Sequence, residues 1–577
     1  MIAQRLAATP RDTGSAAGAS GLLRRLRPAV LLAALAAAGS VDADVRGAGA
    51  AEDPRSAGAE AGRRIYLEGL LPSGEPLRAM AHDGAALTGQ QAACVSCHRR
   101  SGLGVAARGT MAPPVTGDIL YRPVWRGRPE MDMARMTGAN ARPAYSDATL
   151  ERAIVDGLGA DGSALGSGMP RYRIAAGDAS ALLAYLKTLS SKPSPGADAS
   201  VIRFATVVAG DVPQDRRKAL IDVIQTFARE KNAGTRHEIR RRTRPPMDME
   251  FHYILYRDWI VDVWTVTGPP GTWRAQLDRL YQAQPVFAVL GGVAEGPWAP
   301  IHEFCEAEGV PCVFPSTDLP VVDAAGSYVV YFSRGMTLEG EVLAAYVNTR
   351  PEDAPGQLVQ VYREGRPGAT AAAALAARAT ARANPAAGVA LKPGEAASPA
   401  FWSRLAAAHP GATLAVWLES ADLEDVATLA SAQPAPARLF LSSGLAAGAA
   451  LPDALRSRTR YVHPFERPDE FDLRVQRTRT WLRSRKLANP REERTQAEAF
   501  FAVSIVSEAL MHNFNFFVRE YLLEQFERMA RSMVVTAYYP EVALGAGQRF
   551  GSRGAYIVKP GALPGQPATA VSEWIVP

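Results

Sequence analysis

Two cysteines three positions apart, followed directly by a histidine, form the segment 94–98 with the sequence CVSCH. This spacing lets both sulfurs form thioethers with the vinyl groups of a haem while the adjacent imidazole reaches the iron. With 4 Cys and 8 His in the chain, chance would produce the pattern roughly 4 times in 10,000. A bare redox pair and half of a zinc site are the alternatives, but no second Cys-x-x-Cys or paired histidine follows. The segment predicts one haem c, attached through Cys94 and Cys97, with His98 as an axial iron ligand.

The segment from Tyr145 to Leu189 resembles the C-terminal half of class I cytochromes c, on Gly157, Gly162, the pair Met169-Pro170 and the run 185–189. In that family a methionine followed by proline supplies the sixth iron ligand, which implies Met169 here. A thioether on iron raises the reduction potential and suits electron transfer. An iron without a methionine ligand is one alternative, and four other methionines compete with Met169: Met111, Met131, Met133 and Met136.

The same resemblance implies that a carbonyl of the pair Pro113-Pro114 accepts a hydrogen bond from the second nitrogen of His98. Either proline is otherwise an ordinary loop residue. Apolar residues at helical spacing predict helices at 62–69 and 179–189, which would enclose the porphyrin from two sides. We therefore expect an all-α cytochrome c domain over residues 55–190.

Residues 1–50 have the pattern of an export signal followed by an irregular start of the mature chain. Arg24, Arg25 and Arg27 precede an apolar run, 29–38, that is too short to span a bilayer and ends in small residues. Removing residues 1–38 lowers the net charge from +6 to about +2, which argues against nucleic acid as a partner. Nothing later in the chain is apolar for long enough to cross a membrane. The sequence predicts a periplasmic location, where haem attachment and oxidised thiols both occur.

A turn-rich stretch at 190–196 marks a change of pattern, and we place a linker at 191–200. From Val201 onward, strand-like runs alternate with helical stretches, among them the strands 201–208, 286–290 and 328–332. Alternation of this kind implies parallel sheets joined by right-handed crossovers. We expect an α/β domain over residues 201–565.

This second region resembles the type I periplasmic solute-binding proteins, the branched-chain amino-acid class of ABC importers. The matching features are Leu290-Gly291-Gly292 after a strand, Pro315-Ser316-Thr317 after the next, and a crossover helix at 339–346. The resemblance implies two α/β lobes, the second beginning near residue 357 and continuing through the strand 414–418. Its C-terminal stretch, 538–557, resembles binding-protein-like domains associated with quinoprotein dehydrogenase systems.

Ligands of that family lie between the lobes, at the carboxyl ends of strands. Matching by position implies Ser316 and Thr317 as contacts from the first lobe, with Glu419 and Ser420 from the second. Glu295 stands where amino-acid binders usually carry serines, which argues against an amino-acid carboxylate site. The ligand is then a cation, an aromatic compound or an alcohol, or the cleft holds none. Each of these residues is otherwise an ordinary cap or loop residue.

Cys305 and Cys312 are the thiols left after haem attachment. In an oxidising compartment a disulfide between them is plausible, and two buried free cysteines are the alternative.

Together these features predict a periplasmic mono-haem cytochrome that transfers electrons by an outer-sphere route to or from a dehydrogenase or oxidase. Its binding-protein-like domain would bind a small ligand or dock the redox partner. The alternative is a solute receptor for a transporter or sensor, with the haem as an accessory. No phosphate-binding loop and no convincing nucleophile–base set occur, so a catalytic haem enzyme such as a peroxidase is the weaker reading.

Overall fold

The computed structural model describes residues 54–577 except 108–109, 126–140, 243–256, 324–325, 379–385, 512–515, 530–537, 546 and 562–565. The predicted export signal and residues 1–50 lie outside the described residues, as do Met131, Met133, Met136 and the side chain of Met111. Within the described part, no helix combines the length and the apolar character that a membrane span requires.

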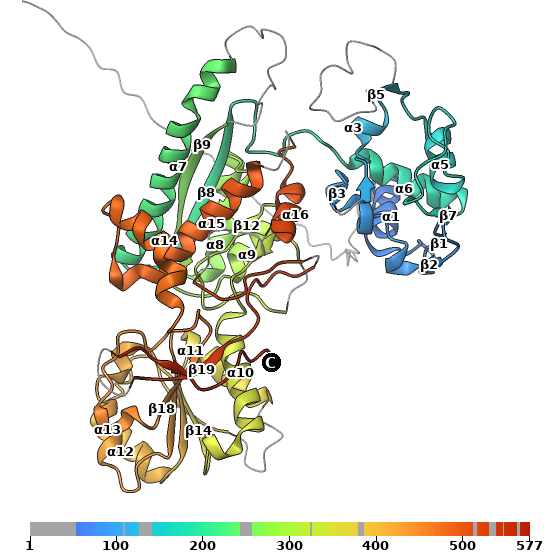
Figure 1. The fold of residues 1–577 in the computed structure, drawn as a ribbon. Coiled ribbons are helices and arrows are strands. Elements are labelled where there is room, and N and C mark those ends of the chain that lie inside the picture. The colour runs from blue at the N-terminus through green and yellow to red at the C-terminus, as the bar shows by residue number, and fades with distance from the viewer. Residues whose placement is uncertain are drawn as a thin grey trace, which may run out of the picture. The chain divides into compact units, whose positions relative to one another are not determined.

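Helices α1 (Pro54–Glu68) and α6 (Ala176–Thr188) pack against each other in the N-terminal region (Figure 1). Their close crossing depends on Gly62, since a Cβ there would stand 2.0 Å from the backbone oxygen of Ala181. Next to it, the rings of Tyr66 and Tyr185 lie 5.3 Å apart. Both helices predicted from the apolar spacing are confirmed.

Short strands accompany these helices, so the region over residues 55–190 is not all-α as the sequence predicts. A three-stranded antiparallel sheet joins residues far apart in the chain, because Ala79 pairs with both Leu87 and Tyr172. Each strand has three residues, which is too few for a clear alternating pattern in the sequence. The elements of this region are α2 (Val95–His98), α3 (Gly117–Leu120), α5 (Asp147–Val155), β1 (Arg78–Met80), β2 (Ala86–Thr88), β3 (Val105–Ala107), β4 (Thr110–Ala112), β5 (Val124–Trp125), β6 (Ala141–Arg142) and β7 (Arg171–Arg173).

The α/β region begins with a parallel sheet, the core of a first lobe. Its strand order is β9-β8-β10-β12-β13, with the short β11 paired to the end of β8. Strands β10, β12 and β13 are continuously apolar, as strands covered on both faces are, whereas the edge strand β9 also carries Asp258 and Asp262. The elements are β8 (Val201–Ala209), β9 (Asp258–Val266), β10 (Ala288–Leu290), β11 (Val293–Ala294), β12 (Cys312–Val313), β13 (Val329–Val330), α7 (Gln214–Arg242), α8 (Trp273–Ala283) and α9 (Ala299–Ala307).

A second lobe repeats this strand order as β15-β14-β16-β17-β18, again parallel, and adds two antiparallel strands, β19 and β20. The predicted start of this lobe near residue 357 and the predicted strand 414–418 are confirmed. The elements are β14 (Leu358–Arg363), β15 (Ala387–Leu391), β16 (Thr413–Trp417), β17 (Arg438–Ser442), β18 (Thr459–His463), β19 (Tyr556–Lys559), β20 (Thr569–Ala570), α10 (Gly335–Thr349), α11 (Pro367–Arg378), α12 (Pro399–Ala408) and α13 (Asp453–Arg456).

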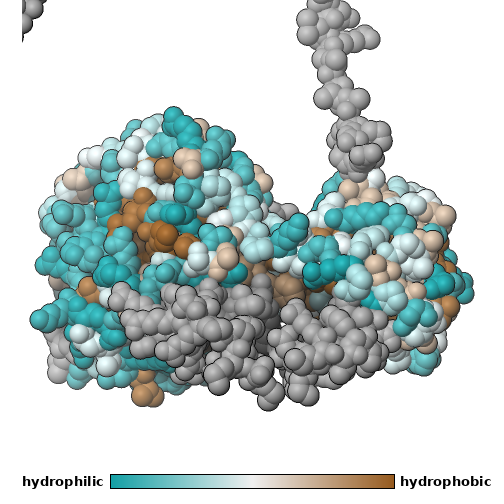
Figure 2. Space-filling view, turned by 90° about the horizontal axis from the view of Figure 1, so that it is seen from above, coloured by the Kyte–Doolittle hydropathy of each residue, from teal (hydrophilic) through white to brown (hydrophobic). Residues whose placement is uncertain are grey.

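After the second lobe the chain returns to the first with α14 (Phe471–Ser484), α15 (Glu493–Met511) and α16 (Arg519–Met529). Phe500 and Phe526 share one core with Phe204 of β8, so these late helices complete the first lobe (Figure 1). The chain then passes Phe550, which bridges to Tyr331, and enters the second sheet as β19. The expected two-lobed α/β architecture is therefore present. On the face drawn in Figure 2, hydrophilic side chains dominate the described surface, with hydrophobic areas among them.

Candidate functional site

The CVSCH segment lies on one short helical turn. Cys94 caps α2, and Arg99 ends it with a positive φ of 63°. His98 is buried, and its Nδ1 lies 2.9 Å from the carbonyl oxygen of Pro113. A carbonyl can only accept, so Nδ1 carries the proton and the lone pair of Nε2 remains for another partner. The predicted hydrogen bond to the Pro113-Pro114 pair is thus confirmed, and Pro113 supplies the carbonyl.

Burial keeps this imidazole neutral. It lowers the pKa of His98, and the hydrogen bond to Pro113 opposes that effect only in part. A neutral imidazole with a fixed tautomer is the form that binds iron or another metal. His98 therefore has the charge and the tautomer that a metal ligand needs.

Cys94 and the predicted sixth ligand, Met169, border apolar surroundings. Cys94 and Met169 pack against the same hydrophobic cluster, which includes Ile65 and Leu183. Burial raises the pKa of the Cys94 thiol to about 12. Two thiols on one turn, a neutral imidazole and a thioether at a shared apolar cluster are the donor set that fits a haem. On this test the residues present match the group that the sequence predicts.

A second candidate site lies where the parallel strands of the two lobes end. In each sheet the strand order reverses next to the first strand, β8 or β14, and such switch points open a crevice at the carboxyl ends of the strands. Glu295 follows β11 in the first lobe, and Glu419 follows β16 in the second. The predicted ligand contacts therefore come from the edges at which this kind of fold binds ligands.

Arg366 joins Glu295 and Glu419 across the lobes, although the sequence analysis did not single it out. Its Nη1 lies 2.7 Å from Glu295 Oε1, while its Nε and Nη2 lie 2.9 and 2.8 Å from the two carboxylate oxygens of Glu419. These hydrogen bonds, that to Glu419 first, raise the pKa of Arg366. The two predicted carboxylates are thus brought together, but each already holds a cation from the chain itself. We refer to Glu295, Arg366 and Glu419 as the interlobe clasp.

The other predicted contacts are Ser316, Thr317 and Ser420, and of these Ser316 is buried. Ser316 is 2% exposed, its N–H donates to the carbonyl of Gly292, and its hydroxyl has no partner within the described residues. The hydroxyl of Thr317 accepts a hydrogen bond from the N–H of Leu319, as a loop-capping residue does. Ser420 begins the short 3₁₀ helix η5 (Ser420–Leu423) and donates its N–H to Leu445. The Ser316 hydroxyl is thus buried without a hydrogen-bond partner among the described residues.

A cluster of charges around Arg494 of α15 also escaped the sequence analysis. Arg494 lies 2.7 Å from Asp318, 2.8 Å from Glu498 and 3.0 Å from the hydroxyl of Tyr539. Glu339 of α10 lies near this group, and burial raises its pKa to about 8. One signal was present in the sequence: Asp318 directly follows the predicted contacts Ser316 and Thr317.

Cys305 of α9 and Cys312 of β12 are both fully buried and lie within contact of each other. Both are thiols in the structure. Burial and the neighbouring Cys312 raise the pKa of Cys305. A disulfide between them stays a prediction.

Comparison with known proteins found no matching family model and no matching curated protein. Solved structures do resemble the chain. A leucine-binding protein, LivK, from Thermotoga maritima is 12% identical, with a TM-score of 0.46 over 65% of this chain and 99% of its own. A branched-chain amino acid ABC transporter protein from Thermus thermophilus with bound valine is also 12% identical, with a TM-score of 0.46 over 66% and 97%. A fatty acid ABC transporter substrate-binding protein from Thermomonospora curvata is 15% identical, with a TM-score of 0.44 over 67% and 95%. Likenesses at these identities and TM-scores leave the ligand and the function open.

Proposed function

We propose that the protein is a periplasmic mono-haem c-type cytochrome joined to a two-lobed binding module. The observation that carries the proposal is the geometry of His98, whose Nδ1 is bound to Pro113 while Nε2 is free of any partner in the described residues. Together with two thiols on the same turn, this is the arrangement that covalent haem attachment needs. The bound haem would supply a one-electron couple for outer-sphere transfer.

The residues around the haem would each have a separate role. Cys94 and Cys97 would hold the porphyrin by thioether bonds, and His98 and Met169 would be the iron ligands. The apolar cluster that Cys94 and Met169 contact would keep water from that part of the site. A haem held by these residues would supply single-electron exchange with a periplasmic dehydrogenase or oxidase.

The two-lobed region favours a second function in the same chain, that of a solute receptor for a transporter or sensor. The observation behind it is the repeated strand order, which places a switch point in each lobe. A ligand entering there would meet the hydroxyl of Ser316 and the interlobe clasp. Because the single charge of Arg366 balances only one of the two carboxylates, the clasp keeps a negative charge with which a cationic ligand can pair, whereas a neutral ligand must fit beside it. In either reading, the module selects a small molecule or docks the redox partner.

The experiment that separates these functions uses the full chain, exported together with haem-attachment machinery. Absorption spectra of the reduced protein with and without carbon monoxide test the iron, and a thermal-shift screen with amino acids, aromatic acids, polyamines and short alcohols tests the module. We expect a spectrum that carbon monoxide barely changes, because both axial positions are occupied. A rapid change would reject the six-coordinate electron carrier. A ligand at 100 times its dissociation constant should stabilise the module by about 2.7 kcal/mol, and a flat screen would reject the receptor.

A further inference from the structure

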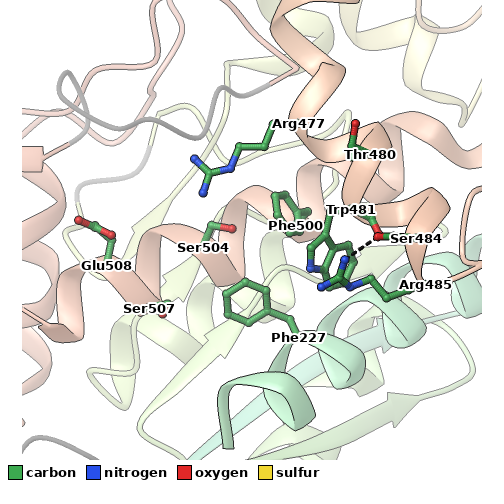
Figure 3. A pocket seen from close by; sticks show the side chains of 10 residues that line it. All are labelled: Phe227, Arg477, Thr480, Trp481, Ser484, Arg485, Phe500, Ser504, Ser507 and Glu508. Carbon is green, nitrogen blue, oxygen red and sulfur yellow. Dashed lines mark hydrogen bonds between the residues drawn. The ribbon is translucent and has the colours of Figure 1, made fainter. Parts of the chain in front are cut away.

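A pocket of about 540 Å³ opens on the first lobe, between α7, α14 and α15 (Figure 3). Its volume lies in the range of small-molecule sites, about 300–1,000 Å³. One face of each helix lines it: 477, 480, 481 and 484 on α14 recur at helical spacing, as do 500, 504, 507 and 508 on α15. None of these residues belongs to the haem segment or the interlobe clasp. The pocket is therefore a separate feature of the molecule.

Three aromatic side chains form one wall of this pocket: Phe227, Trp481 and Phe500. The ring of Trp481 lies 4.8 Å from that of Phe500 and 6.4 Å from that of Phe227, and Phe227 and Phe500 are 6.0 Å apart. Phe500 is buried, while Phe227 and Trp481 are partly buried. A flat aromatic ligand can extend such a group of rings by stacking or edge contacts.

Among the charged residues around the pocket, Arg477 has no anionic partner in the described residues. Arg485 is held by Glu230, with Nε and Nη2 2.8 and 3.0 Å from its carboxylate oxygens. Glu508 attracts the half-buried Lys231: burial lowers the pKa of that lysine, and Glu508 opposes the effect. Arg477 forms no ion pair or hydrogen bond with any residue that the structure describes. In Figure 3 its guanidinium reaches from α14 towards Ser504 and Glu508 on α15.

Two hydroxyls of α15 add polar contacts beside this cation. Ser504 and Ser507 are 8% and 9% exposed and line the pocket. A guanidinium with a neighbouring hydroxyl matches the two oxygens of a carboxylate. We propose that this pocket binds a small aromatic carboxylate, with its ring against Trp481 and Phe500 and its carboxylate on Arg477 and Ser504. The pocket would act independently of the haem and of the cleft between the lobes.

The test uses benzoate as the probe and the full-length protein, followed by calorimetric titration. Arg477→Gln removes the charge from an exposed side chain, so the fold should be kept, and equal melting temperatures would verify that. We expect it to weaken benzoate binding at least tenfold. Arg483→Gln is the matched control, because Arg483 lies on the same helix but does not line the pocket. That control should bind benzoate as the unmodified protein does.

Two further comparisons separate the parts of the proposal. Cyclohexanecarboxylate carries the same charge without a π system, and benzyl alcohol keeps the ring without the charge, so both should bind more weakly than benzoate. Arg366→Gln changes the interlobe clasp and should leave benzoate binding unaltered. The proposal is overturned if the unmodified protein does not bind benzoate, if Arg477→Gln binds it equally well, or if Arg366→Gln rather than Arg477→Gln removes the binding.

Discussion

The CVSCH segment and the interlobe clasp satisfy their polar groups in opposite ways. At the CVSCH segment, one hydrogen bond from His98 to Pro113 fixes a neutral imidazole and leaves its other nitrogen without a partner in the described residues. At the clasp, Arg366 already holds the carboxylates of Glu295 and Glu419. The first site has an open donor atom and can take a metal directly. The second keeps one carboxylate charge unbalanced after that pairing, so a ligand either pairs with this remaining charge, replaces Arg366 or avoids the clasp.

The largest expected effect is the loss of covalently bound haem when Cys94 and Cys97 are replaced. Replacing Cys94 and Cys97 by alanine should abolish covalently bound haem, since both thioether bonds are lost. Haem staining of the denatured, exported protein measures this directly. The matched control replaces Cys305 and Cys312, which lie in the first lobe, and should keep the haem. Equal staining of both double variants would contradict the assignment of the CVSCH segment.

Met169→Ala should remove the sulfur-to-iron charge-transfer band of the oxidised protein while leaving the haem attached. The physical reason is the loss of the thioether, which should also lower the reduction potential. Met80→Ala is the control, because Met80 is 36% exposed on β1. An unchanged band in Met169→Ala would assign the sixth ligand elsewhere.

Arg494→Ala should cost the α/β region about 3 kcal/mol in its free energy of unfolding, because it leaves Glu498, 1% exposed, without its cation. Chemical denaturation followed by circular dichroism gives the measurement. Arg491→Ala, a nearby exposed arginine without an ion pair in the described structure, should change stability by less than about 0.5 kcal/mol. Similar losses of unfolding free energy in both variants would show that the charges around Arg494 do not stabilise the fold more than an exposed arginine does.

The pH dependence of stability should reveal Glu339. Burial raises its pKa from 4.5 to about 8 in the folded protein, and nearby Asp318 acts in the same direction. The folded state therefore favours the protonated form, so this contribution to stability is complete below pH 4.5 and is lost as the pH rises towards 8. Glu339→Gln cannot ionise. Its melting temperature relative to the unmodified protein should rise between pH 5 and pH 8. A constant difference would show that the ionisation of Glu339 does not contribute to the pH dependence of stability.

The smallest stability effect belongs to the clasp. Arg366, Glu295 and Glu419 are 41%, 34% and 36% exposed, and ion pairs at such exposure contribute about 0–1 kcal/mol each. Arg366→Gln should therefore barely change the melting temperature but should widen the ligand-free protein in small-angle scattering, because it unties the lobes. Arg404→Gln on the exposed face of α12 is the control. Identical scattering of the two variants would mean that the clasp does not hold the lobes.

How far the sequence predicts these sites depends on the separation of their residues. CVSCH is one contiguous turn, and the helices on either side show apolar spacing, so this site can be predicted from neighbouring residues in the sequence. The alternating strands likewise indicated two α/β lobes. Arg366 pairs with Glu295 and Glu419 over 71 and 53 positions, and Arg494 pairs with Asp318 over 176. Such partners meet only after the sheets assemble, and no local pattern specifies them.

The most direct test of the central claim is the mass of the exported protein under denaturing conditions, taken together with its visible spectrum. We expect a chain heavier by one haem, with the spectrum of a low-spin c-type cytochrome. A chain of unmodified mass, from cells that attach haem to a control cytochrome, would contradict it.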